Sequence, residues 1–228
     1  PWQGTRALPE GIKPDHPTAA HIIADRIDRD GPIPLGDYMG IANAHYYASK
    51  DPLGEEGDFV TAPEISQMFG EIVGIWLADL WLRKGSPGHC HYVELGPGRG
   101  TLAHDALRSM ARFGCRPSVH FVETSPVLQA KQAQLHPDAT WQADIASLPH
   151  DGPLLIVANE FFDALPVEQF VATSGGWRRQ MVARDRSKFI AVPSIDMAED
   201  QVGGTTGGFP DGTILERSPV SVEWTGNL

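Results

Sequence analysis

The chain is poor in cysteine, in basic side chains and in long apolar runs. Its two cysteines, Cys90 and Cys115, lie in unrelated contexts and predict free thiols rather than a disulfide framework. The 18 Lys and Arg residues are outnumbered by 29 Asp and Glu residues, so the formal net charge is −11. Binding nucleic acid needs a basic face, and the charge argues against that partner. Apolar runs long enough for a transmembrane helix are lacking, so no membrane span is expected.

A metal site is not expected from the sequence either. The run His89-Cys90-His91 contains two residue types that bind metals, but a second ligand pair at a suitable spacing is missing. On a strand, His89 and His91 would face one side and Cys90 the other. The sequence therefore predicts no metal cofactor.

The central part of the chain alternates between short apolar strands and helices. Strands are expected at 90–95, 119–123, 140–141 and 153–158, and helices at 101–113 and 126–135. This βαβ rhythm is typical of a doubly wound parallel sheet, in which ligands bind at the carboxyl ends of the strands. The fold class predicted is α/β with a Rossmann-like core at 86–165, an N-terminal helical and lid segment at 1–85, and a third region at 166–228.

The flanking regions carry other patterns. Helices are expected at 18–29, 35–44 and 61–85, the last beginning with a capping box formed by Thr61 and Glu64. Segments 167–172, 177–183 and 188–192 predict an antiparallel meander, and 213–228 begins a further element. With four parallel strands, segment 153–158 would form an unpaired apolar edge, so the sheet is expected to be C-terminally incomplete.

The most informative motif is Val93-Glu94-Leu95-Gly96-Pro97-Gly98-Arg99-Gly100-Thr101-Leu102. Its glycines, Gly96, Gly98 and Gly100, permit positive φ and a close approach of backbone to ligand, and the following helix directs its first N–H groups to the same place. A dinucleotide fingerprint would need glycine at position 101, which argues against a dehydrogenase. The spacing and Glu94 resemble motif I of class I S-adenosylmethionine (SAM) methyltransferases, where the acid holds the cationic amino-acid end of SAM. A tight turn without a ligand is the alternative.

Two more acids follow predicted strands at the same edge. Glu123 is placed to accept hydrogen bonds from both hydroxyls of a ribose, with Ser125 assigned to the same site; a charge that favours the helix dipole is the alternative. Asp144 is a candidate acceptor for an adenine amino group, with Ile145 against the ring. An ordinary N-cap role would also explain Asp144.

The last predicted parallel strand runs into Asn159-Glu160-Phe161-Phe162-Asp163-Ala164-Leu165-Pro166, where catalytic groups collect in this architecture. Methyl transfer is an in-line displacement that needs a nucleophile held about 3 Å from the sulfonium carbon. Asn159 can orient a donor nitrogen, Glu160 can bind a guanidinium through two parallel hydrogen bonds, and Asp163 is the third catalytic candidate. The alternative is that Asn159 and Asp163 cap a helix and the two phenylalanines are core.

Three blocks together resemble the MidA family, whose mitochondrial member is the complex I assembly-factor protein arginine methyltransferase. They are Gly57-Asp58-Phe59-Val60-Thr61-Ala62-Pro63-Glu64-Ile65-Ser66-Gln67-Met68-Phe69-Gly70-Glu71, the glycine motif and the Asn159–Pro166 run. The resemblance implies a SAM-dependent methyltransferase, with S-adenosylhomocysteine as product, that dimethylates an arginine of a 49-kDa-type complex I subunit and so assists complex I assembly.

The same resemblance implies a lid over SAM that brings Thr61, Pro63, Glu64 and Ser66 near the ligand, with Asn159 also contacting it. A eukaryotic member would act in the mitochondrial matrix and a bacterial one in the cytoplasm. Family members continue beyond residue 228.

Two other functions stay open at this point. One is a methyltransferase acting on a small molecule or another side chain, which an apolar acceptor pocket would favour over converging carboxylates. The other is an assembly chaperone that binds a complex I subunit without catalysis, which the intact glycines, Glu94 and Glu123 argue against. The sequence does not predict the oligomeric state.

Overall fold

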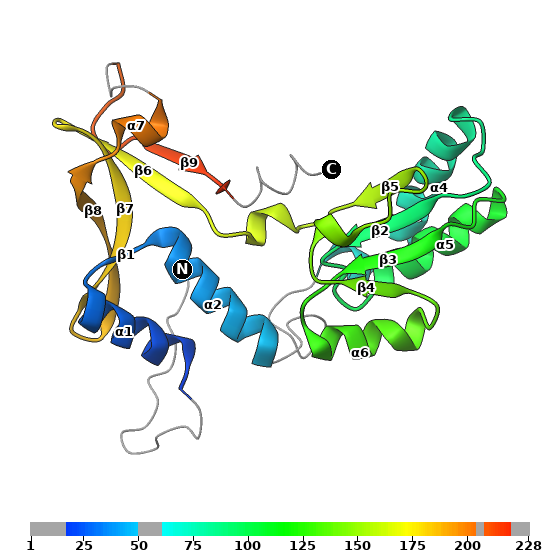
Figure 1. Cartoon of the computed structure of the whole chain (residues 1–228), viewed down its shortest axis with the longest axis horizontal. Coiled ribbons are helices and arrows are strands. Elements are labelled where there is room, and N and C mark those ends of the chain that lie inside the picture. Colours follow the sequence, from blue (N-terminus) through cyan, green and yellow to red (C-terminus); the bar gives the residue numbers. More distant parts are fainter. Residues whose placement is uncertain (1–16, 50–60, 204–207, 220–228) are drawn as a thin grey trace. The chain divides into compact units, whose positions relative to one another are not determined.

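The computed structural model describes residues 17–49, 61–203 and 208–219 (Figure 1). Backbone contacts divide the chain into two compact units, each with its own sheet. The first unit comprises the described residues up to His45 together with Glu168–Arg217, and the second contains Tyr46–Val167. The domain limits expected from the sequence, at 85 and 165, stay predictions.

The second unit contains a four-stranded parallel sheet in the order β4-β3-β2-β5. Its elements are α3 (Ala62–Ile65), α4 (Gln67–Arg83), β2 (His91–Leu95), α5 (Thr101–Arg112), β3 (Ser118–Val122), α6 (Pro126–Leu135), β4 (Thr140–Gln142), η1 (Ile145–Ser147), β5 (Leu154–Val157) and η2 (Phe162–Ala164). From β2 the chain adds β3 and β4 on one side and β5 on the other. The strand order therefore reverses between β2 and β5, the position where such sheets bind ligands.

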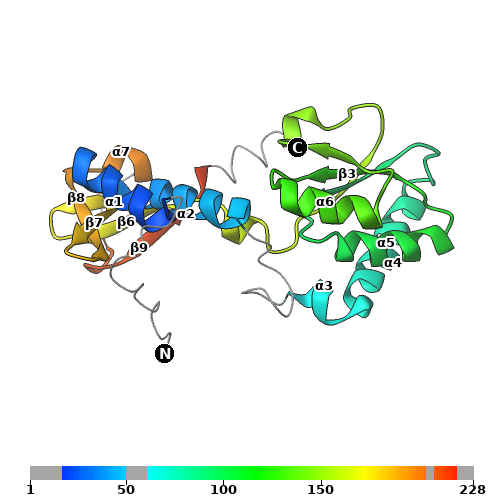
Figure 2. The ribbon, with the colours of Figure 1, turned by 90° about the horizontal axis from the view of Figure 1, so that it is seen from below.

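One face of this sheet packs against helices. Tyr92 and Phe121 are fully buried there against Ala103 and Ala106 of α5, and α4 packs onto the same cluster. Figure 2 shows α4 and α5 together on one side of β3. The two helices approach closely at Gly74, where an added Cβ would lie 2.3 Å from the carbonyl oxygen of Ala106.

The opposite face of the sheet is apolar towards the carboxyl ends of its strands. Val93, Leu95 and Val122 are buried there with Ile145 and Leu148, which follow β4. The apolar strands predicted from the sequence thus form a sheet with a hydrophobic cluster on each face. The α/β class is confirmed.

The helix predicted over 61–85 is not continuous. It is divided into α3 and α4 at Ser66, whose backbone is extended with φ −151° and whose hydroxyl accepts a hydrogen bond from the backbone N–H of Met68. The predicted capping box is also wrong, because Thr61 makes no side-chain capping bond and Glu64 bonds elsewhere. Ser66 starts a second helix because it satisfies an otherwise unpaired N–H group.

The first unit is built on an antiparallel sheet, and the predicted meander is confirmed as β6-β7-β8. Its elements are α1 (Ala19–Asp30), β1 (Ile33–Pro34), α2 (Leu35–Ser49), β6 (Glu168–Thr173), β7 (Gly176–Asp185), β8 (Lys188–Met197), α7 (Glu199–Val202) and β9 (Ile214–Arg217). Two strands far apart in sequence join the meander, since β1 pairs with β7 and β9 with β6. Ile23 and Ile27 of α1 pack with Ile33 and Val182.

Within the described ranges, every helix is too short or too polar to cross a lipid bilayer.

Candidate functional site

The glycine turn lies between β2 and α5, at the carboxyl edge of the parallel sheet. Gly96 has φ +62° and Gly100 has φ +82°, values that side-chain-bearing residues rarely adopt. Gly100 is the N-cap of α5 and provides no side-chain capping bond. The first N–H groups of α5 are therefore directed at the space above the turn, where they suit an electron-rich ligand group.

Helix α6 and its C-cap residue hold this turn through two side chains that the sequence did not single out. The amide Nε2 of Gln132 donates to the carbonyl oxygen of Gly98 at 2.7 Å, and the Nε2 of His136 lies 2.9 Å from the carbonyl oxygen of Gly100. Both side chains are buried, and burial lowers the pKa of His136. Phe161 also lies against the turn, since a Cβ on Gly96 would be 2.7 Å from its Cδ2.

Glu94 is a buried acid at the carboxyl end of β2. Its side chain accepts a 2.6 Å hydrogen bond from the hydroxyl of Tyr92, and the residue is only 3% exposed. Burial raises the pKa of Glu94 to about 8. The hydrogen bond from Tyr92 lowers this pKa, but by less than burial raises it. The carboxyl group is therefore mostly neutral at pH 7, and a cationic ligand group would favour its ionised form.

Glu123 follows β3 at the same edge. One carboxylate oxygen accepts from the backbone N–H of Ser125 at 2.8 Å and the other from the Gln132 amide at 3.3 Å. Burial raises the pKa of Glu123, while these hydrogen bonds act in the opposite direction. The hydroxyl of Ser125 caps α6 by accepting from the N–H of Leu128. Ser125 is thus placed beside Glu123 and orients its carboxylate.

The two candidates that follow β4 occupy structural positions. The carboxylate of Asp144 accepts from the N–H and the hydroxyl of Ser147, both at 3.1 Å, so Asp144 is the N-cap of η1. Ile145 is buried in the core cluster with Val93 and Leu95. Both residues nonetheless lie at the carboxyl edge, and an adenine contact stays a prediction.

The three catalytic candidates follow β5. Asn159 lines an apolar groove between α4, α5 and β5, together with Phe69, Val73, Trp76, Leu102 and Ile156–Ala158. Glu160 is exposed and has φ +48°, an unfavourable conformation for a residue with a side chain. Asp163 is exposed within η2, whose N-cap is Phe161 and lacks a side-chain bond. Asn159 and Asp163 are therefore not caps of η2.

Glu64 joins the segment implied to form a lid to the glycine motif. Glu64 accepts a 2.7 Å hydrogen bond from the hydroxyl of Thr101, the first residue of α5, and pairs with Arg99 at 3.6 Å. Pro63 is buried, and Ser66 caps α4. Thr61 is the N-cap of α3, whereas Gly57–Val60 of the same block lies outside the described residues.

These residues fit SAM at the carboxyl edge. A buried carboxyl beneath the turn suits the ammonium group of its amino-acid end, and Glu123 suits a pair of hydroxyls. Residues 72–226 match the Methyltransf_28 family, described as S-adenosyl-L-methionine-dependent methyltransferases.

The chain belongs to the Methyltransf_28 family.

Individual relatives extend the match. A Drosophila melanogaster protein named protein arginine methyltransferase NDUFAF7 homolog, mitochondrial, is 41% identical over 197 residues, covering 73% of this chain and 45% of the relative. The Homo sapiens protein arginine methyltransferase NDUFAF7, mitochondrial, is 35% identical over 257 aligned residues, covering 93% of this chain and 58% of the relative. This Methyltransf_28 chain therefore spans about half the length of the curated relatives it matches.

Solved structures share the fold. A Burkholderia thailandensis protein crystallised with S-adenosyl-homocysteine superposes with a TM-score of 0.70 at 22% identity, covering 92% of this chain and 58% of that chain. A second structure from the same organism gives a TM-score of 0.71 at 24% identity, covering 92% and 56%. At this identity the likeness shows that this Methyltransf_28 chain shares their fold.

Proposed function

We propose that the protein containing this chain is a SAM-dependent methyltransferase that modifies protein arginine. The observation that carries the proposal is Glu94, a buried acid with a raised pKa two residues before Gly96 in a Methyltransf_28 chain. The names of the relatives, protein arginine methyltransferases, support the choice of acceptor. Family membership supports SAM as the cosubstrate and S-adenosylhomocysteine as the product.

Binding would use the groups that three strands bring to one edge. When bound, SAM supplies an electrophilic methyl group on a sulfonium sulfur. Glu94, ionised by the approach of a cation, would hold the amino-acid end together with N–H groups at the start of α5. Glu123 would accept from the ribose hydroxyls, with its orientation fixed by Ser125 and Gln132.

The acceptor would be positioned by residues that follow β5. Glu160 would bind the guanidinium through two parallel hydrogen bonds and keep positive charge away from the attacking nitrogen. Asn159, which lines the apolar groove, would orient that nitrogen, and Asp163 would add a second carboxylate. The unfavourable φ of Glu160 supports a functional role, because strained residues gather at functional sites.

A finer proposal concerns the partner. We infer from the resemblance of the three sequence blocks that the acceptor is an arginine of a 49-kDa-type complex I subunit and that methylation assists complex I assembly. The protein would then act in the mitochondrial matrix in a eukaryote, as the names of the relatives support, or in the cytoplasm of a bacterium.

The test uses the full-length protein with methyl-labelled SAM. It is incubated with the purified 49-kDa-type subunit and, separately, with an extract of its own cells, and the labelled residue is identified by mass spectrometry. We expect label on arginine of that subunit. Label on a small molecule or on another side chain would overturn the arginine proposal, and binding of S-adenosylhomocysteine without any transfer would favour a non-catalytic role.

A further inference from the structure

A histidine-rich cluster lies at the amino edge of the parallel sheet, away from the glycine turn. His91 is the first residue of β2 and pairs with Leu154, the first residue of β5. His89 precedes β2, and Asp151 lies in the turn before β5. The cluster therefore joins the beginnings of two adjacent strands, whereas the candidate SAM site lies where they end.

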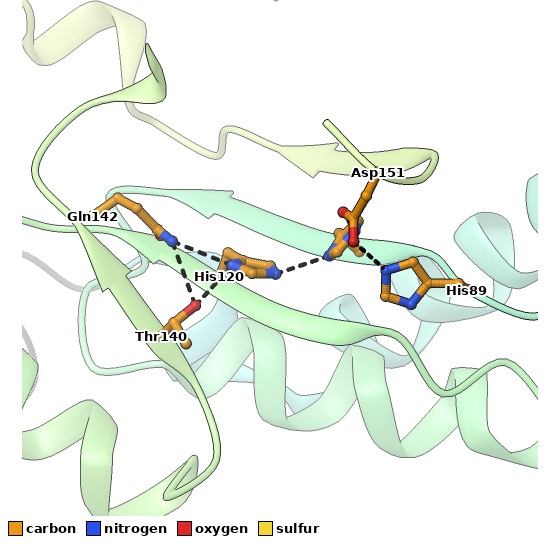
Figure 3. A network of polar contacts seen from close by, with 6 residues as sticks. His89, His120, Thr140, Gln142 and Asp151 are labelled. Carbon is orange, nitrogen blue, oxygen red and sulfur yellow. Dashed lines mark hydrogen bonds and ion pairs between the residues drawn. The ribbon is translucent and has the colours of Figure 1, made fainter. Parts of the chain in front are cut away.

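The side chains of this cluster face one another, and Figure 3 shows the ring of His89 turned towards the carboxylate of Asp151. The Nε2 of His89 lies 3.1 Å from Oδ2 of Asp151, and the Nε2 of His91 lies 2.9 Å from Oδ1. One ligand atom from each of the three residues falls within 4.8 Å of the others. The two histidines share a face as their spacing predicts, while Cys90 is buried in the core on the other side.

His91 is held in place from behind. It is 3% exposed, and its Nδ1 lies 2.9 Å from the Nε2 of His120. The Nδ1 of His120 in turn lies 2.7 Å from the hydroxyl of Thr140 (Figure 3). Metal-binding histidines commonly use the second ring nitrogen in this way, because a hydrogen bond there fixes the tautomer and the ring orientation.

We propose that His89, His91 and Asp151 bind a divalent transition-metal ion, for which zinc is the best fit. Two imidazole nitrogens and one carboxylate oxygen form a donor set of the type that binds zinc, with water as a fourth ligand. Bond lengths of about 2.0–2.2 Å need only a small convergence of these atoms. The carboxylate can move, since the Asp151 side chain is 69% exposed.

The proton positions required by metal binding suit the surrounding groups. With Nε2 of His91 on the metal, its Nδ1–H would donate to Nε2 of His120, which would then carry its own proton on Nδ1. The buried Oε1 of Gln142 has no hydrogen-bond partner among the described residues, while the Nε2 of the same amide lies 3.3 Å from the Nδ1 of His120. A half-turn of this amide would present Oε1 as the acceptor for that proton.

Gly152 leaves the space that brings Asp151 close to the two histidines. A Cβ at this position would lie 3.2 Å from Cδ2 of His89 and 3.4 Å from Nε2 of His91. A side chain there would press on both imidazoles, so glycine lets the turn that carries Asp151 close over them. The run His89-Cys90-His91 alone does not predict a metal site, because the third ligand comes from a turn about sixty positions later.

The proposal gives the metal a structural role that is independent of methyl transfer. It would link the segment before β2 to the turn before β5 without contacting the carboxyl edge. Loss of the metal should thus lower thermal stability while leaving the affinity for S-adenosylhomocysteine unchanged.

The experiment uses untagged full-length protein, treated with a chelator and then dialysed. Zinc binding is measured by competition with a chromophoric chelator, and cobalt is added in parallel because tetrahedral cobalt has a characteristic visible spectrum. The variants are His89→Gln and Asp151→Asn, whose side chains are exposed enough to change without unfolding the protein. His104→Gln, an exposed histidine on α5, is the control.

We expect one zinc ion per chain, a higher melting temperature with zinc, and at least about tenfold weaker binding in both variants but not in the control. Failure of the wild-type protein to bind zinc would overturn the proposal. So would unchanged zinc affinity in the His89→Gln, Asp151→Asn double variant, which would place the ion elsewhere. Circular dichroism of each variant confirms that it remains folded.

Discussion

The hydroxyl of Tyr92 donates a 2.6 Å hydrogen bond to the carboxyl of Glu94, two residues further along the same strand and on the same buried face. Burial of this pair raises the pKa of Glu94 to about 8 and also raises the pKa of Tyr92. Glu94 of β2 therefore keeps its proton at neutral pH in the folded protein. Two of the predictions below follow from that acid.

The first prediction concerns stability against pH. Glu94 has an ordinary pKa of 4.5 in the unfolded chain and about 8 when folded. Between these values the folded state holds the proton and the unfolded state does not, so stability falls as pH rises, by at most about 1.4 kcal/mol per pH unit. Above the folded pKa this contribution is flat. Urea unfolding of wild type and of Glu94→Gln across this range checks it, and parallel pH curves for the two proteins would contradict it.

The second prediction concerns ligand affinity. Because the proposed site binds the ionised form of Glu94, S-adenosylhomocysteine should bind more tightly as pH rises towards about 8, releasing a proton at neutral pH. Calorimetry in buffers of different ionisation enthalpy measures the proton released. The Glu94→Gln variant should bind more weakly and release none from this group. The same release from wild type and variant would show that another group provides the proton.

The third prediction concerns Gly96. Alanine there meets both a backbone φ of +62° and the ring of Phe161 at 2.7 Å, whereas Gly114→Ala meets a φ of +83° with nothing within 4 Å. The positive φ costs about 1–2 kcal/mol for alanine at either position. Only Gly96→Ala adds a steric clash, so it should be the more destabilising change. Because Phe161→Ala removes the clash, urea unfolding of the double variant should show a smaller loss of stability than the sum of the two single losses. Equal losses of stability in Gly96→Ala and Gly114→Ala would contradict the predicted clash with Phe161.

The fourth prediction concerns helix packing. Glycine to alanine within a helix is ordinarily stabilising by up to about 1 kcal/mol, but at Gly74 the new Cβ would lie 2.3 Å from the carbonyl oxygen of Ala106. We expect Gly74→Ala to lower stability by about 1–3 kcal/mol, the usual cost of overpacking. Because the contact is with backbone, Ala106→Gly should not restore the loss. Thermal unfolding of the single and double variants is the measurement.

The fifth prediction concerns transfer. Glu160→Gln removes the charge proposed to bind the guanidinium and should reduce methyl transfer by about 100-fold or more, a typical cost of losing one electrostatic group. Binding of S-adenosylhomocysteine should be almost unchanged. Asp138→Asn, an exposed acid after α6, provides the control. An equal loss of binding and transfer in Glu160→Gln would place this residue in the cofactor site instead.

The parallel core could be predicted from the sequence because its strands are apolar runs that end in turn signals. The strand before Gly96 and the helix after Pro126 are found where their patterns indicated. The division at Ser66 was missed because a helical apolar stripe continues through it, and only the local serine cap reveals a second start. The short strands β1 and β9 carry too few residues for a period-2 signal.

In the candidate site, only residues that share one continuous motif could be predicted together from the sequence. Glu94 and the glycines share a run, so the turn and its acid could be predicted together. Gln132 and His136 could not, since their contacts with the turn depend on how α6 is rotated against the sheet. The local sequence predicts Glu64 in a capping box and the family resemblance implies a place near the ligand, whereas its hydrogen-bond partner is the Thr101 hydroxyl on another helix.

The amide of Gln132 fixes how α6 can vary. It donates to Gly98 and Glu123 and accepts from the indole N–H of Trp141, so all its hydrogen-bonding groups are used. One residue inserted or deleted between Ser125 and Gln132 would turn the amide by about 100° around the helix axis, away from all three partners. The seven-residue spacing from Ser125 to Gln132 therefore sets the distance between the loop of Gly98 and the loop of Glu123, which are separate in sequence.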